Sequence, residues 1–157
     1  MCDYSLYVAQ NRLAAEGEQL ALYRFDSGSI GFASVSDLEA EACRKNRKGG
    51  FWRAVWDALC SEQSVRLPAV CIPPGARLLL TNVPESTQEA LQIGPSEVVV
   101  VTEISSHSYA YRDALVLPNK TSVLLQDLSE GIRALVLSLA SEEDSEEVND
   151  EKLHWAY

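Results

Sequence analysis

The sequence predicts an α+β protein in which a small N-terminal sheet with a helix pair packs on a C-terminal barrel-like, mostly antiparallel sheet. Short apolar segments bounded by Gly, Pro, Asn and Ser recur through the second half, as strands do. Helical signals concentrate before residue 64. With 157 residues, 46% of them hydrophobic, the chain is long enough to bury one core. We therefore expect a single compact domain over 1–140, with lobes 1–64 and 65–140, and a separate tail over 141–157.

The N-terminal lobe begins with three expected strands separated by glycine-containing turns. Gly17 closes the first connection, and Asp26-Ser27-Gly28-Ser29 is a strong turn signal before the third strand. The strands are expected over Tyr4–Gln10, Leu20–Phe25 and Ile30–Ser34.

A helix pair follows these strands. Ser36 and Glu39 form a capping box, which predicts a helix from this point to about Arg47, and Gly49-Gly50 ends it. A second helix is expected over Phe51–Cys60, because its apolar residues recur at helical spacing on one face. These residues are Trp52, Val55, Trp56 and Leu59.

A rigid Pro73-Pro74-Gly75 corner joins the two lobes. It separates a short apolar strand over Ala69–Ile72 from a second over Ala76–Leu80. Proline fixes φ near −65°, and glycine accepts positive φ, so Pro74 and Gly75 predict the central positions of a type II turn. Cys71 is therefore expected at the end of a strand, directly before a stiff turn.

The C-terminal lobe is expected to be mostly β-structure. A short helix from Glu85 is ended by Gly94 and Pro95. The valine-rich segment is predicted to be a central strand, because both of its faces are apolar. The strands are expected over Glu97–Ile104, Tyr109–Leu117, Ser122–Gln126 and Arg133–Leu139.

The net charge of −10 is concentrated in the tail, where residues 142–151 hold seven acids and no base. The rest of the chain has 16 acids and 13 bases. An acidic chain argues against general nucleic-acid binding. No apolar run is long enough for a transmembrane helix, and the first residues do not form a signal peptide. A cytoplasmic protein with reduced thiols is the expectation.

The chemical candidates are Cys2 and Cys71, the two cysteines placed at ends of expected strands. Cleavage of Met1 would leave Cys2 with a thiol and a free amine, groups suited to nucleophilic or metal chemistry. The pair is a candidate dithiol, disulfide or metal site, and the alternative is that Cys71 is a small core residue. The expected polar neighbours are Asp3, Asn11, Arg12 and Arg24.

The tail is the other candidate site, because an acidic spacer ends in bulky apolar residues. Its aromatic and aliphatic anchors, together with those of the second helix, favour docking to a protein partner or to another copy of the chain. The expected docking residues are Trp52, Trp56, Leu153, Trp155 and Tyr157. No nucleotide-loop or metalloprotease motif indicates a particular cofactor.

These observations favour a non-enzymatic cytoplasmic accessory or binding protein, such as a subunit of a larger assembly. The alternative is a small thiol- or metal-dependent protein or enzyme that uses Cys2 and Cys71.

Overall fold

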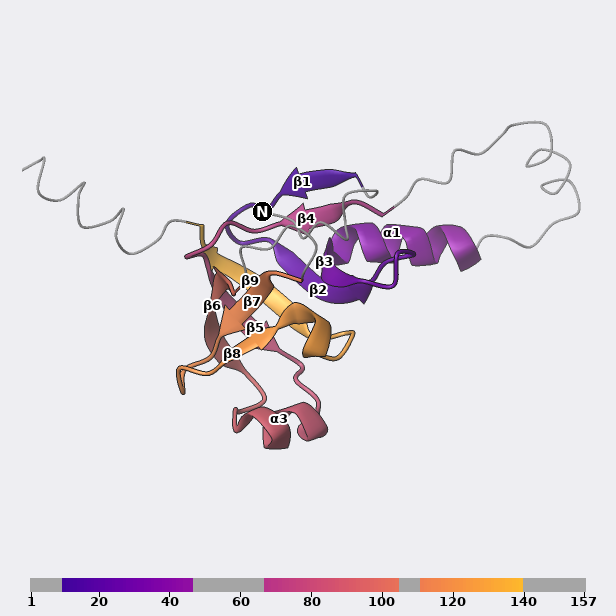
Figure 1. The fold of residues 1–157 in the computed structure, drawn as a ribbon. Coiled ribbons are helices and arrows are strands. Elements are labelled where there is room, and N and C mark those ends of the chain that lie inside the picture. The colour runs from indigo at the N-terminus through magenta and orange to yellow at the C-terminus, as the bar shows by residue number, and fades with distance from the viewer. Residues whose placement is uncertain (1–9, 47–66, 105–110, 140–157) are drawn as a thin grey trace, which may run out of the picture.

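Nine strands form one continuous sheet in the computed structural model, which describes residues 10–46, 67–104 and 111–139. The order across the sheet is β1-β4-β3-β2-β9-β5-β6-β7-β8 (Figure 1). β1 and β4 are parallel, and every other neighbouring pair is antiparallel. The bounds are β1 (Asn11–Leu13), β2 (Gln19–Arg24), β3 (Ile30–Ser34), β4 (Ala69–Cys71), β5 (Arg77–Thr81), β6 (Glu97–Glu103), β7 (Asp113–Val116), β8 (Ser122–Leu124) and β9 (Arg133–Ser138).

The last of the described strands, β9, lies in the middle of the sheet. Ala134 of β9 is in register with Leu20 of β2 on one side and with Leu80 of β5 on the other. β9 therefore joins strands from both halves of the chain. The architecture is broadly α+β, with a sheet curled into a half-barrel. The small N-terminal sheet expected from the sequence is continuous with the C-terminal strands.

The core lies on the inner side of the curled sheet. Alternate residues of each strand point to this side, because successive side chains of a strand face opposite ways. Burial follows this alternation in β5, β6 and β9, and apolar residues from these strands and from β2 and β7 fill the same interior. The largest contributions include Leu20, Leu78, Leu80, Val99, Leu115 and Val136, each at most 1% exposed.

Helix α1 (Val35–Asn46) packs beside β2 and β3 (Figure 1). A second, smaller apolar cluster lies here, in which Leu38 of α1 packs against Phe25, Ala33 and Ala69. The rings of Tyr23 and Phe25 meet edge to face, with centroids 5.2 Å apart. β2 and β3 are thus covered on both sides over most of their length.

Helix α1 begins at Val35, slightly earlier than the capping box predicts. β3 ends at Ser34, so the strand runs directly into the helix without a connecting turn. The hydroxyls of Ser34 and Ser36 are hydrogen-bonded at 2.8 Å, and Asp37 stays in the first turn. An acidic residue there is favourable to the helix dipole.

Helix α3 (Glu85–Leu91) ends before the expected glycine stop. Gln92 takes the left-handed conformation at φ 54°, and it serves as the C-cap. Gly94 therefore does not end the helix. Its N–H donates to Glu97 Oε1 at 2.9 Å. A short 3-10 helix, η2 (Leu125–Asp127), replaces the last two residues of the strand expected over Ser122–Gln126.

Several expected elements lie outside the described residues. These are the strand over Tyr4–Gln10 except Gln10 itself, the helix over Phe51–Cys60, and the tail over 141–157. β7 begins at Asp113, and residues 105–110 before it are also outside the described ranges. The boundaries of the predicted lobes and tail therefore stay predictions.

Candidate functional site

The Pro73-Pro74-Gly75 corner forms the turn that the sequence predicts. Gly75 has φ 87°, a left-handed value that favours glycine, and the Ala76 N–H donates to the Pro73 carbonyl at 3.3 Å. Backbone hydrogen bonds also join the corner to β6. The Gly75 N–H donates to the Val101 carbonyl at 2.8 Å, and the Val101 N–H donates to the Ala76 carbonyl at 2.9 Å. The turn thus fixes the direction in which β4 ends.

Cys71, the last residue of β4, is 9% exposed and disulfide-bonded. Its partner cysteine lies outside the described residues. The expectation of reduced thiols therefore does not hold for Cys71, whereas Cys43 on α1 is free and exposed. Cys2 and Asp3 are also outside the described residues. The pairing of Cys2 with Cys71 stays a prediction.

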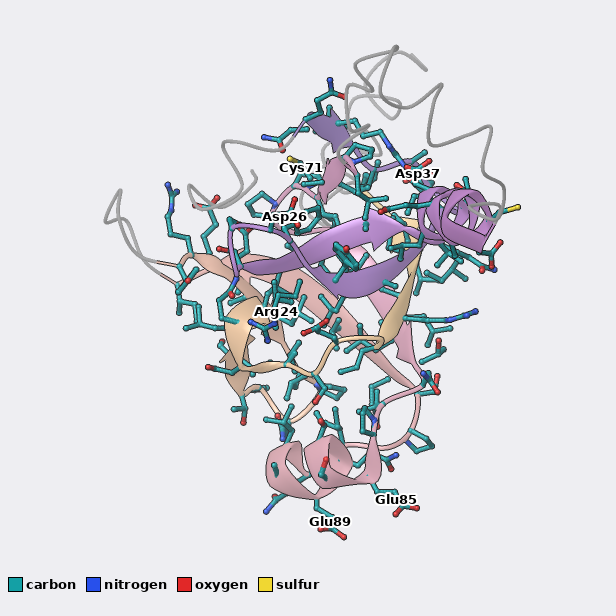
Figure 2. The ribbon with its side chains drawn as sticks, turned by 90° about the vertical axis from the view of Figure 1, so that its right-hand side faces the viewer. Arg24, Asp26, Asp37, Cys71, Glu85 and Glu89 are labelled. Carbon is teal, nitrogen blue, oxygen red and sulfur yellow. The ribbon has the colours of Figure 1, made fainter. Side chains whose placement is uncertain are left out.

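Two of the expected polar neighbours lie on β1, the strand next to Cys71. Asn11 is in register with Ala69, and Arg12 is in register with Val70. β1 is held further by the Ala14 N–H, which donates to the Cys71 carbonyl at 2.9 Å. Figure 2 shows Cys71 at the end of the molecule opposite Glu85 and Glu89 of α3.

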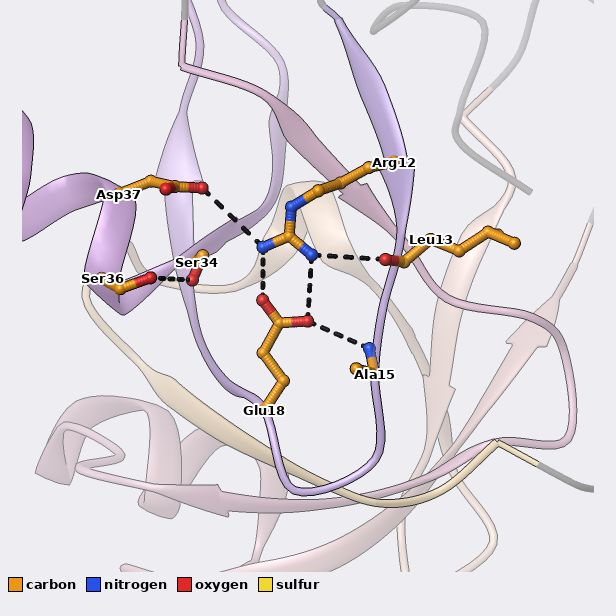
Figure 3. Close-up of polar contacts among 7 residues, drawn as sticks. All are labelled: Arg12, Leu13, Ala15, Glu18, Ser34, Ser36 and Asp37. Carbon is orange, nitrogen blue, oxygen red and sulfur yellow. Dashed lines mark hydrogen bonds and ion pairs between the residues drawn. The ribbon is translucent and has the colours of Figure 1, made fainter.

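The Arg12 guanidinium forms ion pairs with the carboxylates of Glu18 and Asp37 (Figure 3). It forms a two-pronged hydrogen bond with Glu18, donates to the Leu13 carbonyl at 3.3 Å, and forms an ion pair with Asp37 Oδ2 at 3.7 Å. Glu18 Oε2 also accepts the Ala15 N–H at 3.0 Å. The cluster ties β1, the β1–β2 turn and the first turn of α1 together.

The same contacts shift the titration of the pair. The hydrogen bond from Arg12 is the largest influence on the Glu18 pKa and lowers it, against the opposing effect of burial. The Ala15 N–H lowers it further. The hydrogen bond to Glu18 likewise raises the pKa of Arg12. Both groups are held charged, which is the arrangement of a structural ion pair.

Arg24, the remaining polar candidate, is engaged at a turn of its own. Its Nε donates to Glu130 Oε1 at 2.7 Å, and its Nη1 donates to the Gly28 carbonyl at 2.9 Å. Arg24 is in register with Ile30, at the other end of β2 and β3 from α1. Its charge therefore stabilises the β2–β3 turn.

No three His, Cys, Asp or Glu side chains come together as metal ligands among residues 10–46, 67–104 and 111–139. The cluster of Arg12, Glu18 and Asp37, which involves the strand next to β4, is thus a set of ion pairs. A metal site that uses Cys2 falls outside the part of the chain that the structure describes.

A different surface stands out on the convex side of the sheet. Leu79 of β5 is in register with Val98 of β6 and with Leu135 of β9, so the three form one cross-strand row. Val98 is 38% exposed, and Leu137, farther along β9, is 42% exposed. None of the described helices packs on these three strands as α1 does on β2 and β3. The row is thus an apolar part of the sheet face that is exposed at Val98 and half-buried at Leu79 and Leu135.

We call the outward positions of these three strands the outer face. Their composition is unusual for a solvent-facing sheet surface, which is ordinarily polar. The apolar members are Leu79, Val98, Val100, Leu135 and Leu137, and the polar members are Arg77, Thr81, Thr102 and Arg133. The only charges on the outer face are therefore those of two arginines.

The valine run of β6 is the sequence signal for the outer face, although we interpreted it only as the mark of a central strand. Four successive valines, Val98–Val101, predict a central strand with two apolar faces. β6 is an interior strand between β5 and β7, as expected. Val99 is fully buried, whereas Val100 is 36% exposed. A strand can thus be apolar on both faces with only one face packed on the core.

The predicted docking residues are outside the part of the chain that the structure describes. Trp52 and Trp56 of the expected second helix, and Leu153, Trp155 and Tyr157 of the tail, all lie outside the described residues. Their role stays a prediction.

Comparison with known proteins places the chain in no family. No protein-family model, no curated protein and no solved structure matches it. Among the described helices, none is long and apolar enough to cross a membrane.

Proposed function

We propose that the protein is a non-enzymatic accessory or binding protein that docks a protein partner on the outer face. The second helix and the acidic-aromatic tail are retained as further docking elements in this proposal. A cytoplasmic location remains the expectation from the sequence, although a disulfide such as that of Cys71 is more typical of oxidising compartments.

The observation that supports this proposal is the register of Val98, Leu79 and Leu135 across three neighbouring strands. Contiguous apolar surface exposed to water is unfavourable, and its burial is the main driving force of protein association. Soluble proteins expose large apolar patches mostly where something binds. The fold does not need these outward residues for its core, which lies on the opposite side of the same strands.

The composition of the outer face also indicates the kind of partner. Interface centres are enriched in aromatic residues, methionine and arginine and depleted in lysine, glutamate and aspartate. Arg77 and Arg133 are both exposed on this face. A complementary partner would bring apolar side chains to the row and carboxylates to Arg133. A nucleic acid fits poorly, because the chain as a whole carries a net charge of −10.

Photocrosslinking of the full chain from the outer face tests the proposal. Benzoylphenylalanine replaces Val98 at the row, and in a matched control it replaces Leu13, which is 75% exposed on β1. We expect a protein adduct from position 98 in cells, identified by mass spectrometry, that position 13 does not give.

The captured partner is then purified and titrated with variants of the full chain. Leu137→Lys places a charge at the most exposed apolar residue of the outer face, beside the row, and should weaken binding at least about tenfold. Leu13→Lys adds the same charge to an exposed leucine elsewhere and should bind like the wild type. If both positions give the same adducts, or if Leu137→Lys binds normally, the outer face is not the docking surface.

A thiol- or metal-dependent activity at Cys2 and Cys71 is the alternative. It requires reduction of the Cys71 disulfide, because the thiolate is the nucleophile and the metal ligand. Elemental analysis and thiol titration of the reduced full chain, with Cys2→Ser and Cys71→Ser as comparisons, would test it. Absence of bound metal together with unreactive thiols would reject this alternative.

A further inference from the structure

We infer that the acidic tail over 141–157 docks on the outer face of its own chain. This inference rests on the proposed function, since it assigns a competitor for the surface that a partner would bind. Four observations carry it: where the tail begins, how far it reaches, its charge and its apolar end.

The tail begins beside the outer face. Ser138 at the end of β9 is in register with Arg77 of β5, and a register shift lies directly next to this pair. Leu137 is exposed there, whereas Leu139 packs partly against the core. The Leu139 N–H also donates to Glu16 Oε1 at 3.0 Å. The last described residue of the chain is therefore anchored at the margin of the row.

The tail is long enough to return across the row. Neighbouring strands lie about 4.8 Å apart, so crossing from β9 to β6 needs roughly 10 Å. An extended chain spans about 3.3 Å per residue, and the residues between Leu139 and Leu153 can therefore bridge roughly 40 Å. A short flexible tether gives an effective concentration of the order of mM. Docking within one chain is thus favoured over capture of a second copy.

The charges of the two surfaces are complementary. Residues 142–151 contain seven acids and no base. The outer face contains Arg77 and Arg133 and no acid. Charge pairs at a partly desolvated surface orient the approach and set the register.

The apolar residues at the end of the tail are also complementary to the apolar row of the outer face. Leu153, Trp155 and Tyr157 follow the acidic run. Val98 and Leu79 lie on neighbouring strands of the row, with their apolar side chains directed outward. Trp and Tyr supply large contact area and are frequent anchors of interfaces. A partner that binds the outer face would have to displace these anchors.

The experiment uses the full chain with benzoylphenylalanine at position 98, irradiated at dilute concentration. Trypsin cuts after Lys152 and releases the tail end as Leu153–Tyr157. We expect this peptide to be crosslinked to the peptide that carries position 98, in a species of unchanged monomer mass. The same photoreactive residue at position 13 should give no such crosslink.

Mixing chains labelled with ¹⁵N and unlabelled chains separates docking within one chain from exchange between copies. Docking in cis gives crosslinked peptide pairs that are wholly labelled or wholly unlabelled. Mixed pairs would show that a second copy occupies the outer face, and they would overturn the inference. Absence of any crosslink to Leu153–Tyr157 would overturn it as well.

A tail variant tests the charge argument without touching the sheet. Replacing the first five acids by amides (Glu142→Gln, Glu143→Gln, Asp144→Asn, Glu146→Gln and Glu147→Gln) should lower the crosslink yield several-fold. Raising the salt from about 0.1 M to about 1 M shortens the Debye length from about 10 Å to about 3 Å and should have the same effect. A yield unchanged by both would reject the charge pairing.

The result separates this inference from the proposed function. A partner adduct from position 98 without any tail crosslink supports the docking function and rejects tail docking. A tail crosslink without any partner adduct supports tail docking and rejects the docking function.

Discussion

The side-chain amide of Gln126 makes both hydrogen bonds that a neighbouring strand would make with Ile30. The Ile30 N–H donates to Gln126 Oε1 at 2.9 Å, and Gln126 Nε2 donates to the Ile30 carbonyl at 2.7 Å. Ile30 opens β3, and Gln126 lies in η2, directly after the edge strand β8. One side chain therefore links the β8 edge of the half-barrel to β3.

Removal of this amide should destabilise the fold. Ile30 is 2% exposed, so Gln126→Ala would leave a buried N–H and a buried carbonyl without these partners. The expected loss is about 1–3 kcal/mol in the free energy of unfolding, measured by urea denaturation. Gln19→Ala, at an exposed position of β2, is the control and should change little. Equal effects of the two substitutions would contradict the role of Gln126.

Replacement of the same residue by an acid should add a pH dependence. In Gln126→Glu, the carboxylate can accept from the Ile30 N–H but repels the Ile30 carbonyl. Protonation restores a donor, so this variant should lose less stability below about pH 4, near the usual pKa of glutamate, than at pH 7. The measurement is the difference in unfolding free energy from wild type across this range.

The Arg12–Glu18 pair should make stability depend on pH in the acidic range. The Glu18 pKa is lowered in the folded protein, mainly by Arg12. Its contribution is therefore fully present above the unfolded pKa, about 4.3, and is lost as the pH falls through the lower folded value. Glu18→Gln should cost about 0.5–1 kcal/mol at pH 7, a modest value because the Arg12 side chain is 38% exposed.

The difference in unfolding free energy between wild type and Glu18→Gln should become smaller as the pH drops below about 4.3. Glu39→Gln, on the exposed side of α1, serves as the matched substitution. A difference that stays constant as the pH falls from 7 to well below the usual pKa of glutamate, about 4.3, would refute the ion-pair contribution.

Gly75 should tolerate asparagine better than alanine. Its φ of 87° lies in the left-handed region, where a side chain costs roughly 1–2 kcal/mol. Asparagine visits this region more readily than other residues with a side chain. Thermal unfolding should therefore rank wild type above Gly75→Asn and Gly75→Asn above Gly75→Ala. Equal stability of the two variants would show that the backbone of the corner can relax.

Alkylation of the denatured, unreduced chain should modify Cys43 and spare Cys71. If Cys2 is the partner of Cys71, Cys2→Ser frees Cys71 for alkylation, and Cys60→Ser does not. Peptide mapping by mass spectrometry distinguishes the two. The reverse pattern would assign the bond to Cys60.

Local patterns in the sequence predict most strands well. The strand over Ile30–Ser34 has the predicted bounds, and that over Leu20–Phe25 is shifted by one residue. The turn at Gly75 also forms as predicted. These features depend on neighbouring residues, through side-chain alternation and the special conformations of proline and glycine.

Contacts between distant residues were not predictable in the same way. No residue near Gln126 in the sequence indicates that its amide forms hydrogen bonds with Ile30. The ion pair of Glu18 with Arg12 likewise depends on the position of β1 in the sheet. The solvent exposure of residues on the outer face was not predicted, because a run of valines has the same pattern whether one or both faces of the strand are covered. The candidate Cys2–Cys71 site is located only at Cys71.

The position of β9 has a consequence for how the protein is made. β9 is the last described strand to be synthesised, yet it separates β2 from β5 in the sheet. Until residue 138 has emerged from the ribosome, those two strands each lack a partner at an edge. Unpaired strand edges invite pairing with other chains. A nascent chain stalled before β9 should therefore be the species that needs a chaperone most.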